Sequence, residues 1–219
     1  MSVTADLVIH NGKVVSPDSV IDASVAIKEG TILSVGEPDA MPPARETLDA
    51  KGLHILPGAI DVHVHFRDPG YPHKEDFASG TAAAAFGGVT TVFDMPNTIP
   101  PVGTPELLAA KHKIAAEKAH VDFGLYALLG DDTIKDAVEM AKTAIGFKLY
   151  MGNTFGAIPT ASTATMLEAF ETVAPTGKRV GVNVAMLARF DKGEWVESWT
   201  FADEMGFLLQ VGQPNLLLP

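Results

Sequence analysis

The chain has 219 residues, of which 47% are hydrophobic and 20% charged, and its formal net charge is −11. Such an acidic chain disfavours binding to nucleic acid or to an anionic membrane surface. It contains no cysteine, so any metal site must use histidine, carboxylate or a modified lysine. No apolar run reaches the roughly 18–20 residues that span a bilayer. The N-terminus lacks the pattern of a signal peptide, so a cytoplasmic location is expected by default.

Residues 1–56 predict a small β domain. Alternating apolar and polar residues over 6–15 favour a hairpin that turns at Asn11-Gly12, and residues 21–35 repeat the pattern. These strands are too few to bury both faces of a sandwich by themselves.

From residue 57 onward the chain alternates between predicted strands and helices, and the strands begin roughly every 30 residues, the length of a βαβ unit. The predicted strands are Ile60–Arg67, Val89–Met95, Val121–Leu129, Ile145–Met151 and Arg179–Val184. The predicted helices are Phe77–Phe86, a helix capped by Thr104 that runs to Lys118, a helix from Asp131 or Asp132 to Lys142, and Thr163–Val173.

Serial βα units form either an open doubly wound sheet or a (β/α)8 barrel, and polar residues on the inward face favour the barrel. Residues 57–219 are too few for a whole barrel, which takes about 250 residues. The predicted fold is therefore α/β: the first four to five βα units of a TIM barrel, incomplete, after a small β-sandwich domain. A helix over 187–199 is one interpretation of the stretch that follows. A truncated or misread gene product is expected.

The strongest chemical signal is His63 and His65 on the first predicted barrel strand. A strand sends alternate side chains to the same face, so these imidazoles lie about 6.5–7 Å apart along it, close enough to share one metal ion. Asp61 shares this face but is expected to be a structural hydrogen-bonding group. Two ordinary histidines are the alternative interpretation.

Three further residues are candidates for the same site. Lys148, in the middle of a strand, is either a snorkelling lysine or a buried amine whose pKa is lowered enough to react with CO2 and give an anionic ligand. Arg67 is expected on the face of the two histidines, where its fork suits a carboxylate, although a surface salt bridge would also explain it. Asn97 either binds substrate or caps a turn.

The segments around these residues resemble cyclic amidohydrolases of the amidohydrolase superfamily, and dihydroorotases in particular. The resemblance covers about residues 5–190. The motifs that carry it are residues 57–70, 74–81, 87–91, 94–98 and 147–152. The segment before residue 56 resembles the family's composite sandwich domain.

The resemblance implies a zinc site and a substrate. His63, His65 and Lys148, the last N6-carboxylated, would hold two zinc ions, and a bridging hydroxide would attack the carbonyl of a small cyclic amide. Arg67 and Asn97 would bind the carboxylate of dihydroorotate, which is interconverted with N-carbamoyl aspartate in pyrimidine biosynthesis. Homo-oligomer formation stays open, and no nucleic-acid or membrane partner is expected.

The sequence also departs from the family pattern. The family's third histidine follows the fifth strand, but here Val182 is followed directly by Asn183. The fourth histidine and the general acid/base aspartate belong to later strands, so no catalytic residue is assigned and the chain as it stands is expected to be inactive. An allantoinase or another cyclic amidohydrolase is one alternative. A non-catalytic, dihydroorotase-like structural subunit is the other.

Overall fold

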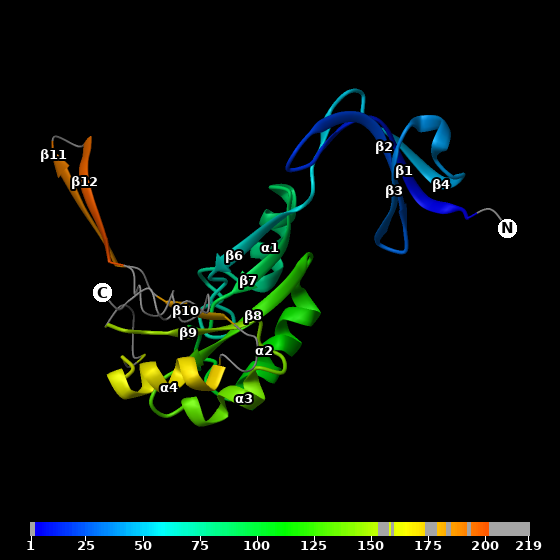
Figure 1. Cartoon of the computed structure of the whole chain (residues 1–219). Helices are drawn as coiled ribbons and strands as arrows, with labels where there is room; N and C mark the ends of the chain where they lie inside the picture. The colour runs from blue at the N-terminus through cyan, green and yellow to red at the C-terminus, as the bar shows by residue number, and fades with distance from the viewer. Residues whose placement is uncertain are drawn as a thin grey trace. The chain divides into compact units, whose positions relative to one another are not determined.

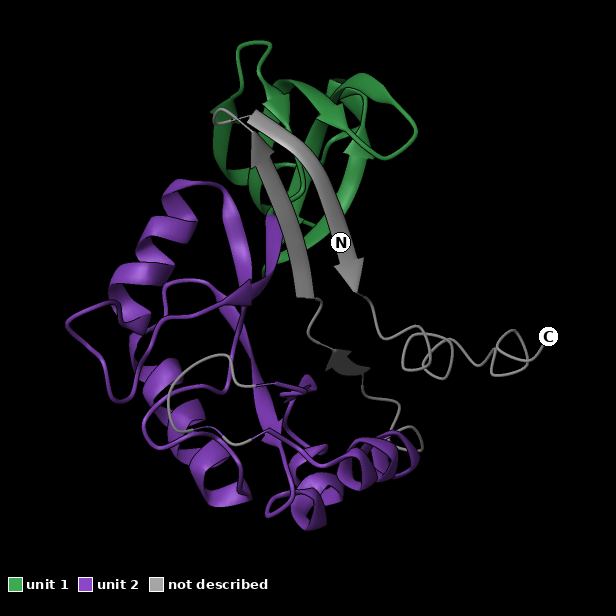
Figure 2. Ribbon diagram, turned by 90° about the vertical axis from the view of Figure 1, so that its left-hand side faces the viewer, with its two compact units in different colours: residues 1–58 green, residues 59–219 purple. Residues whose placement is uncertain are grey.

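The computed structural model describes residues 3–152, 158 and 160–173, together with the backbone of 179–182, 185–191 and 194–201. The chain divides into two compact units, Met1–Gly58 and Ala59–Pro219, shown in different colours in Figure 2. The division lies close to the boundary between residues 56 and 57 expected from the sequence. In the described part of the chain, no helix combines the length and the apolar character needed to cross a membrane.

The first unit is a five-stranded sheet. Strand β1 is central, pairing antiparallel with β2 and parallel with β4 and β5, and β3 lies on the outer side of β2. Ala5, Val8 and Ala26 form its small core. The strands are β1 (Ala5–Val15), β2 (Val20–Lys28), β3 (Thr31–Gly36), β4 (Ala44–Asp49) and β5 (His54–Ile55), with a short 3-10 turn at Pro38–Ala40.

The expected hairpin at Asn11-Gly12 is wrong, whereas the second hairpin, β2–β3, is confirmed. The chain continues through Asn11 as one strand, and the register against β2 shifts between Ile9 and Gly12. This bulge keeps β1 paired on both sides, which a reversal of the chain would prevent. A Cβ atom on Gly12 would lie 2.2 Å from the Ile55 side chain, so the glycine permits close packing here.

The second unit is built on a parallel sheet in the order β10-β9-β8-β7-β6 (Figure 1). Consecutive strands are neighbours, as in a barrel, and the order does not reverse as it does in a doubly wound sheet. The strands are β6 (Ala59–Val64), β7 (Val89–Asp94), β8 (Asp122–Leu129), β9 (Gly146–Leu149) and β10 (Arg179–Val182). The helices are α1 (Phe77–Phe86), α2 (Pro105–Lys118), α3 (Ala137–Met140) and α4 (Thr163–Val173).

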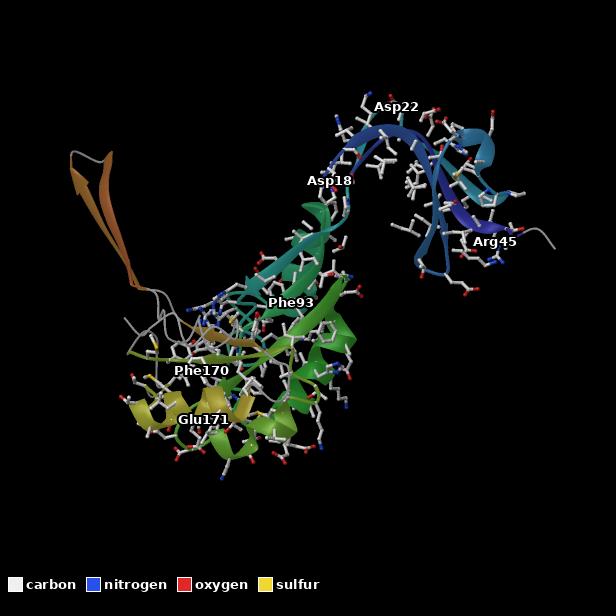
Figure 3. All side chains as sticks on the ribbon, in the orientation of Figure 1. Asp18, Asp22, Arg45, Phe93, Phe170 and Glu171 are labelled. Carbon is white, nitrogen blue, oxygen red and sulfur yellow. The ribbon has the colours of Figure 1, made fainter. Side chains whose placement is uncertain are left out.

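Helices and strands share one core, which includes Phe77 of α1, Leu108 of α2 and Phe147 of β9. On α4, Phe170 packs against this core and Glu171 is exposed; both are labelled in Figure 3. The predicted incomplete barrel is therefore confirmed: its first five strands are present and its helices cover the sheet.

Local capping explains why α1 and α2 start where they were predicted to start. At α1, Asp76 accepts a hydrogen bond from Ser79 N at 2.8 Å in a capping box. Thr104 caps α2 by accepting from Leu107 N at 3.3 Å. The predicted helix over 131–142 is instead a 3-10 turn (Ile134–Asp136) followed by the short α3. Asp131, which with Asp132 was one of the two residues expected to start that helix, accepts from Ser162 N at 2.9 Å and so holds the start of α4.

The expected helix over 187–199 is also wrong. Residues there form β11 (Ala185–Asp191) and β12 (Glu194–Phe201), which pair antiparallel. Aromatic and β-branched residues such as Trp195, Val196 and Trp199 favour extended backbone, and this preference prevails over a weak helical pattern.

Candidate metal centre

The candidate site lies at the carboxyl ends of the parallel strands. His63 is in β6 and His65 follows it, Asn97 comes shortly after β7, and Lys148 is in β9. In barrels built from parallel strands, chemistry takes place at this end of the sheet. Residues that are 85 positions apart in the chain, from His63 to Lys148, are therefore brought to one edge.

The two imidazoles point at a common position. His63 Nε2 and His65 Nε2 lie 3.2 Å apart, with ring centroids separated by 5.1 Å. Two nitrogens that bind one zinc ion at about 2.0–2.1 Å each would be about 3–3.4 Å apart at near-tetrahedral angles. The observed separation suits two ligands of one ion.

Asn97 orients His65. Its Oδ1 atom accepts a hydrogen bond from His65 Nδ1 at 2.7 Å. A carbonyl oxygen can only accept, so Nδ1 carries the proton and Nε2 keeps its lone pair. A hydrogen bond from the far ring nitrogen is the usual way in which a metal-binding histidine is held in the correct tautomer.

The electrostatic environment keeps both imidazoles neutral, as metal ligands must be. Burial lowers the pKa of His65 to about 4; the charges of Arg67, His63 and Lys148 act in the same direction, while the bond to Asn97 opposes it. The pKa of His63 is also lowered, first by burial and then by the Lys148 charge, whereas Asp61 opposes the shift. Asp61 accepts a hydrogen bond from His63 N at 3.1 Å, in keeping with a structural role.

Lys148 is buried, with 8% of its surface exposed. Burial lowers the pKa of its ammonium group, which favours the neutral amine that reaction with CO2 requires. Its Nζ atom lies 5.4 Å from the centre of the Tyr150 ring. The burial argues against a lysine that snorkels to solvent.

Arg67 is near the site, but not in the way the sequence suggested. The strand ends at Val64, and Arg67 adopts the left-handed backbone conformation with φ of 63°. The expectation that it simply continues the alternating face of His63 and His65 is therefore wrong. Its Nη1 atom approaches Asn97 O at 3.5 Å. Its charge adds to the burial that lowers the pKa of His65, and it opposes the burial that raises the pKa of Tyr150.

The described residues supply a partial ligand set. Among them, no group of three His, Cys, Asp or Glu side chains is close enough to hold a metal ion. A fit to zinc would therefore depend on the two histidines and on Lys148 once carboxylated, which would together make the three protein ligands that a catalytic zinc site takes. The position at which the family pattern departs, residue 183, lies outside the described residues.

Sequence reasoning missed three residues around the site. Tyr150 is buried two positions after Lys148, and the alternation used for the histidines could have identified it. Asp94 and Lys111 form a buried ion pair with a distance of 2.5 Å. They belong to different elements, and no sequence pattern links them.

The fold is the first part of a barrel of parallel strands, with His63, His65 and Lys148 at the carboxyl end of the sheet. The chain belongs to the amidohydrolase family, whose sequence profile matches residues 54–180.

Its relatives include enzymes of several specificities. The chain is 40% identical over 149 residues to an allantoinase of Streptomyces avermitilis and 40% identical over 152 residues to a dihydroorotase of Methanothermobacter thermautotrophicus. Among solved structures it resembles the L-hydantoinase (dihydropyrimidinase) of Arthrobacter aurescens, with 30% identity and a TM-score of 0.77 over 80% of this chain. The chain spans 34% and 33% of the two curated relatives and 40% of the hydantoinase.

Proposed function

We propose that this chain is the metal-binding first part of a zinc-dependent cyclic amidohydrolase that acts on dihydroorotate. The observation that carries the proposal is the 3.2 Å approach of His63 Nε2 and His65 Nε2 at the carboxyl end of the sheet. Family membership supports the reaction class, hydrolysis or closure of a cyclic C–N amide bond.

The residues have separate roles in this proposal. His63 and His65 bind through their unprotonated Nε2 atoms, and Lys148, after reaction of its neutral amine with CO2, adds an anionic oxygen ligand. When bound, zinc supplies a Lewis acid and a hydroxide nucleophile at neutral pH. The substrate is a small cyclic amide, and homo-oligomer formation is compatible with the proposal.

The choice of dihydroorotate depends on Arg67 and Asn97. Asn97 uses Oδ1 for His65, which leaves its Nδ2 hydrogens as donors for a substrate carboxylate. The guanidinium of Arg67, which approaches Asn97 O, provides the planar fork that suits the same group. An allantoinase is the second candidate, because curated relatives of similar identity carry both names.

Zinc binding tests the proposed site. We expect the purified chain to bind zinc in equilibrium dialysis, and His63→Ala/His65→Ala to abolish binding. Added bicarbonate should raise zinc occupancy in the parent chain but not in Lys148→Met, which keeps the length of the side chain without its amine. Zinc binding that survives the double substitution would overturn the site.

Turnover tests the assignment of the substrate. The general acid/base aspartate is not assigned to this chain, so the chain alone is expected to hydrolyse neither dihydroorotate nor allantoin; rates near those of intact relatives would contradict this. Residues 1–182 joined to the remaining C-terminal part of the Methanothermobacter dihydroorotase should act on dihydroorotate. Arg67→Asn in that fusion should lose this activity, and preferential turnover of allantoin by the unsubstituted fusion would favour the second candidate.

A further inference from the structure

The ion pair between Asp94 and Lys111 is bonded to the backbone directly after His65, through Phe66 N, and has no part in the proposed chemistry. Asp94 ends β7 and Lys111 is in α2, and their exposed fractions are 0% and 1%. Removing two charges from water is expensive, and a buried ion pair is often no more stabilising than a well-packed apolar pair. Stability alone is therefore a weak explanation for it.

Asp94 uses both of its carboxylate oxygens. Oδ2 lies 2.5 Å from Lys111 Nζ, and Oδ1 accepts a hydrogen bond from Phe66 N at 2.9 Å. Phe66 stands between His65 and Arg67, so the carboxylate binds the backbone at the residue that separates a candidate metal ligand from a candidate substrate ligand.

The pair replaces a regular hydrogen bond of the sheet. Met95 N donates to Val64 O at 3.0 Å, and a regular parallel ladder would continue with Phe66 N donating to Met95 O. Instead, Met95 O accepts from Lys111 Nζ at 2.7 Å, and Phe66 N donates to Asp94. Phe66 N and Met95 O therefore bond to the side chains of the ion pair rather than to each other, at the point where β6 ends.

The Phe66 side chain is fixed on its other side. Its ring is buried and packs edge-on against Phe77, with centroids 5.4 Å apart. A Cβ atom on Gly80 would lie 2.3 Å from this ring, so α1 approaches closely. Because its ring and its amide are both held, the backbone at Phe66 leaves the strand in a fixed direction, and this direction determines the positions of His65 and Arg67.

We propose that Asp94 and Lys111 are positioning residues for the metal centre: through Phe66 N they hold the chain turned out of the strand, and so aim the His65 imidazole at the common metal position. The inference rests on the proposed function for its zinc readout. Neither residue contacts the metal or the substrate in this proposal.

Two matched double variants test the inference. Asp94→Asn/Lys111→Met removes both charges but keeps a side-chain oxygen for Phe66 N, whereas Asp94→Leu/Lys111→Met removes that acceptor with a side chain of similar shape. Both lose the Lys111 donor equally. We expect Asp94→Asn/Lys111→Met to bind zinc within about threefold of the parent chain, and Asp94→Leu/Lys111→Met to bind about 10–100-fold more weakly. Equal zinc affinities in two folded variants would overturn the inference.

A metal-free readout separates this inference from the proposed function. Nitrogen NMR of His65 should show Nδ1 protonated in the parent chain and in Asp94→Asn/Lys111→Met, with loss of this single tautomer in Asp94→Leu/Lys111→Met. If the parent chain binds no zinc, the proposed function fails, but the NMR comparison still decides the positioning role: unchanged His65 signals in both variants would refute it.

The parent chain offers a test that needs no variant. The Phe66 amide should be strongly protected from hydrogen exchange, because its acceptor is a buried carboxylate rather than water. Exchange of the Phe66 amide as fast as that of the exposed loop amides would refute the hydrogen bond on which the positioning role depends, whether or not the double variants fold.

Discussion

The two strands that carry the candidate ligands are packed very differently. All four residues of β9 are buried, whereas five of the six residues of β6 are exposed. Among the described residues, β9 lies between β8 and β10, but β6 pairs only with β7. Packing therefore holds Lys148 in place. His63 lies in an edge strand and His65 directly follows it, and the end of this strand is fixed mainly by hydrogen bonds with Asp94, Met95 and Asn97. The core therefore positions Lys148, which is the lysine side of the site, and a few polar contacts position His63 and His65, which are the histidine side.

The largest effect is expected on the free energy of unfolding, from substitutions that compare the packing of β9 with that of β6. Phe147, in β9, is fully buried, whereas Val62, in β6, is 55% exposed. Phe147→Ala should lower the free energy of unfolding by about 3–5 kcal/mol because it leaves a cavity. Val62→Ala should lower it by about 0.5 kcal/mol, as at other surface positions. Urea denaturation measures both, and a similar loss for the two variants would show that β6 is covered in solution.

A smaller effect concerns the polar contacts on the histidine side. Asn97→Ala removes the acceptor of His65 Nδ1, so it should weaken zinc binding by about 10–100-fold through loss of the preferred tautomer. Thr98→Ala is the matched control, because Thr98 is also buried and its hydroxyl donates to the nearby Pro100 O rather than to His65. Competition with a chromogenic chelator measures the affinities. An equal loss in both variants would assign the effect to the loop rather than to His65.

The features that could be predicted from the sequence are those that depend on residues close together in the chain. The bounds of α1 and α4 followed from local helix signals, and the histidine pair followed from the alternation of side chains along a strand. The position of Arg67 did not follow, because the strand ends where Asp94, 28 residues away from Phe66, accepts a backbone hydrogen bond. Interactions between elements of this kind leave no periodic pattern.

The first unit shows the same limit. The Asn11-Gly12 pair is typical of a hairpin turn when considered locally, yet pairing on both sides of β1 makes it a bulge. By contrast, the proximity of Tyr150 to Lys148 could be predicted from the sequence by the argument used for His63 and His65, because both pairs are two residues apart.

The smallest expected effect is a difference in pH dependence between the two sides of the site. In the metal-free chain the pKa of His65 falls from 6.5 to about 4, so between these values the unfolded chain binds a proton that the folded chain does not. Stability should therefore be fully present above about pH 6.5 and decrease as the pH falls towards about 4. Burial lowers the pKa of Lys148 from 10.5. Its contribution to stability should therefore also rise with pH, but on the alkaline side, as the pH approaches that value.

Urea midpoints measured with a chelator present distinguish these two windows. His65→Asn should lose less stability than the parent chain between pH 7 and pH 5, within the interval set by the lowered pKa of His65. The stability of Lys148→Met should change with pH as that of the parent chain does in that acid interval. On the alkaline side the two pH dependences should differ, because the titrating amine is gone. An acid loss as large in His65→Asn as in the parent chain would show that His65 is solvated when the metal is absent. The histidine side would then form only on metal binding, whereas the buried lysine side would already be in place.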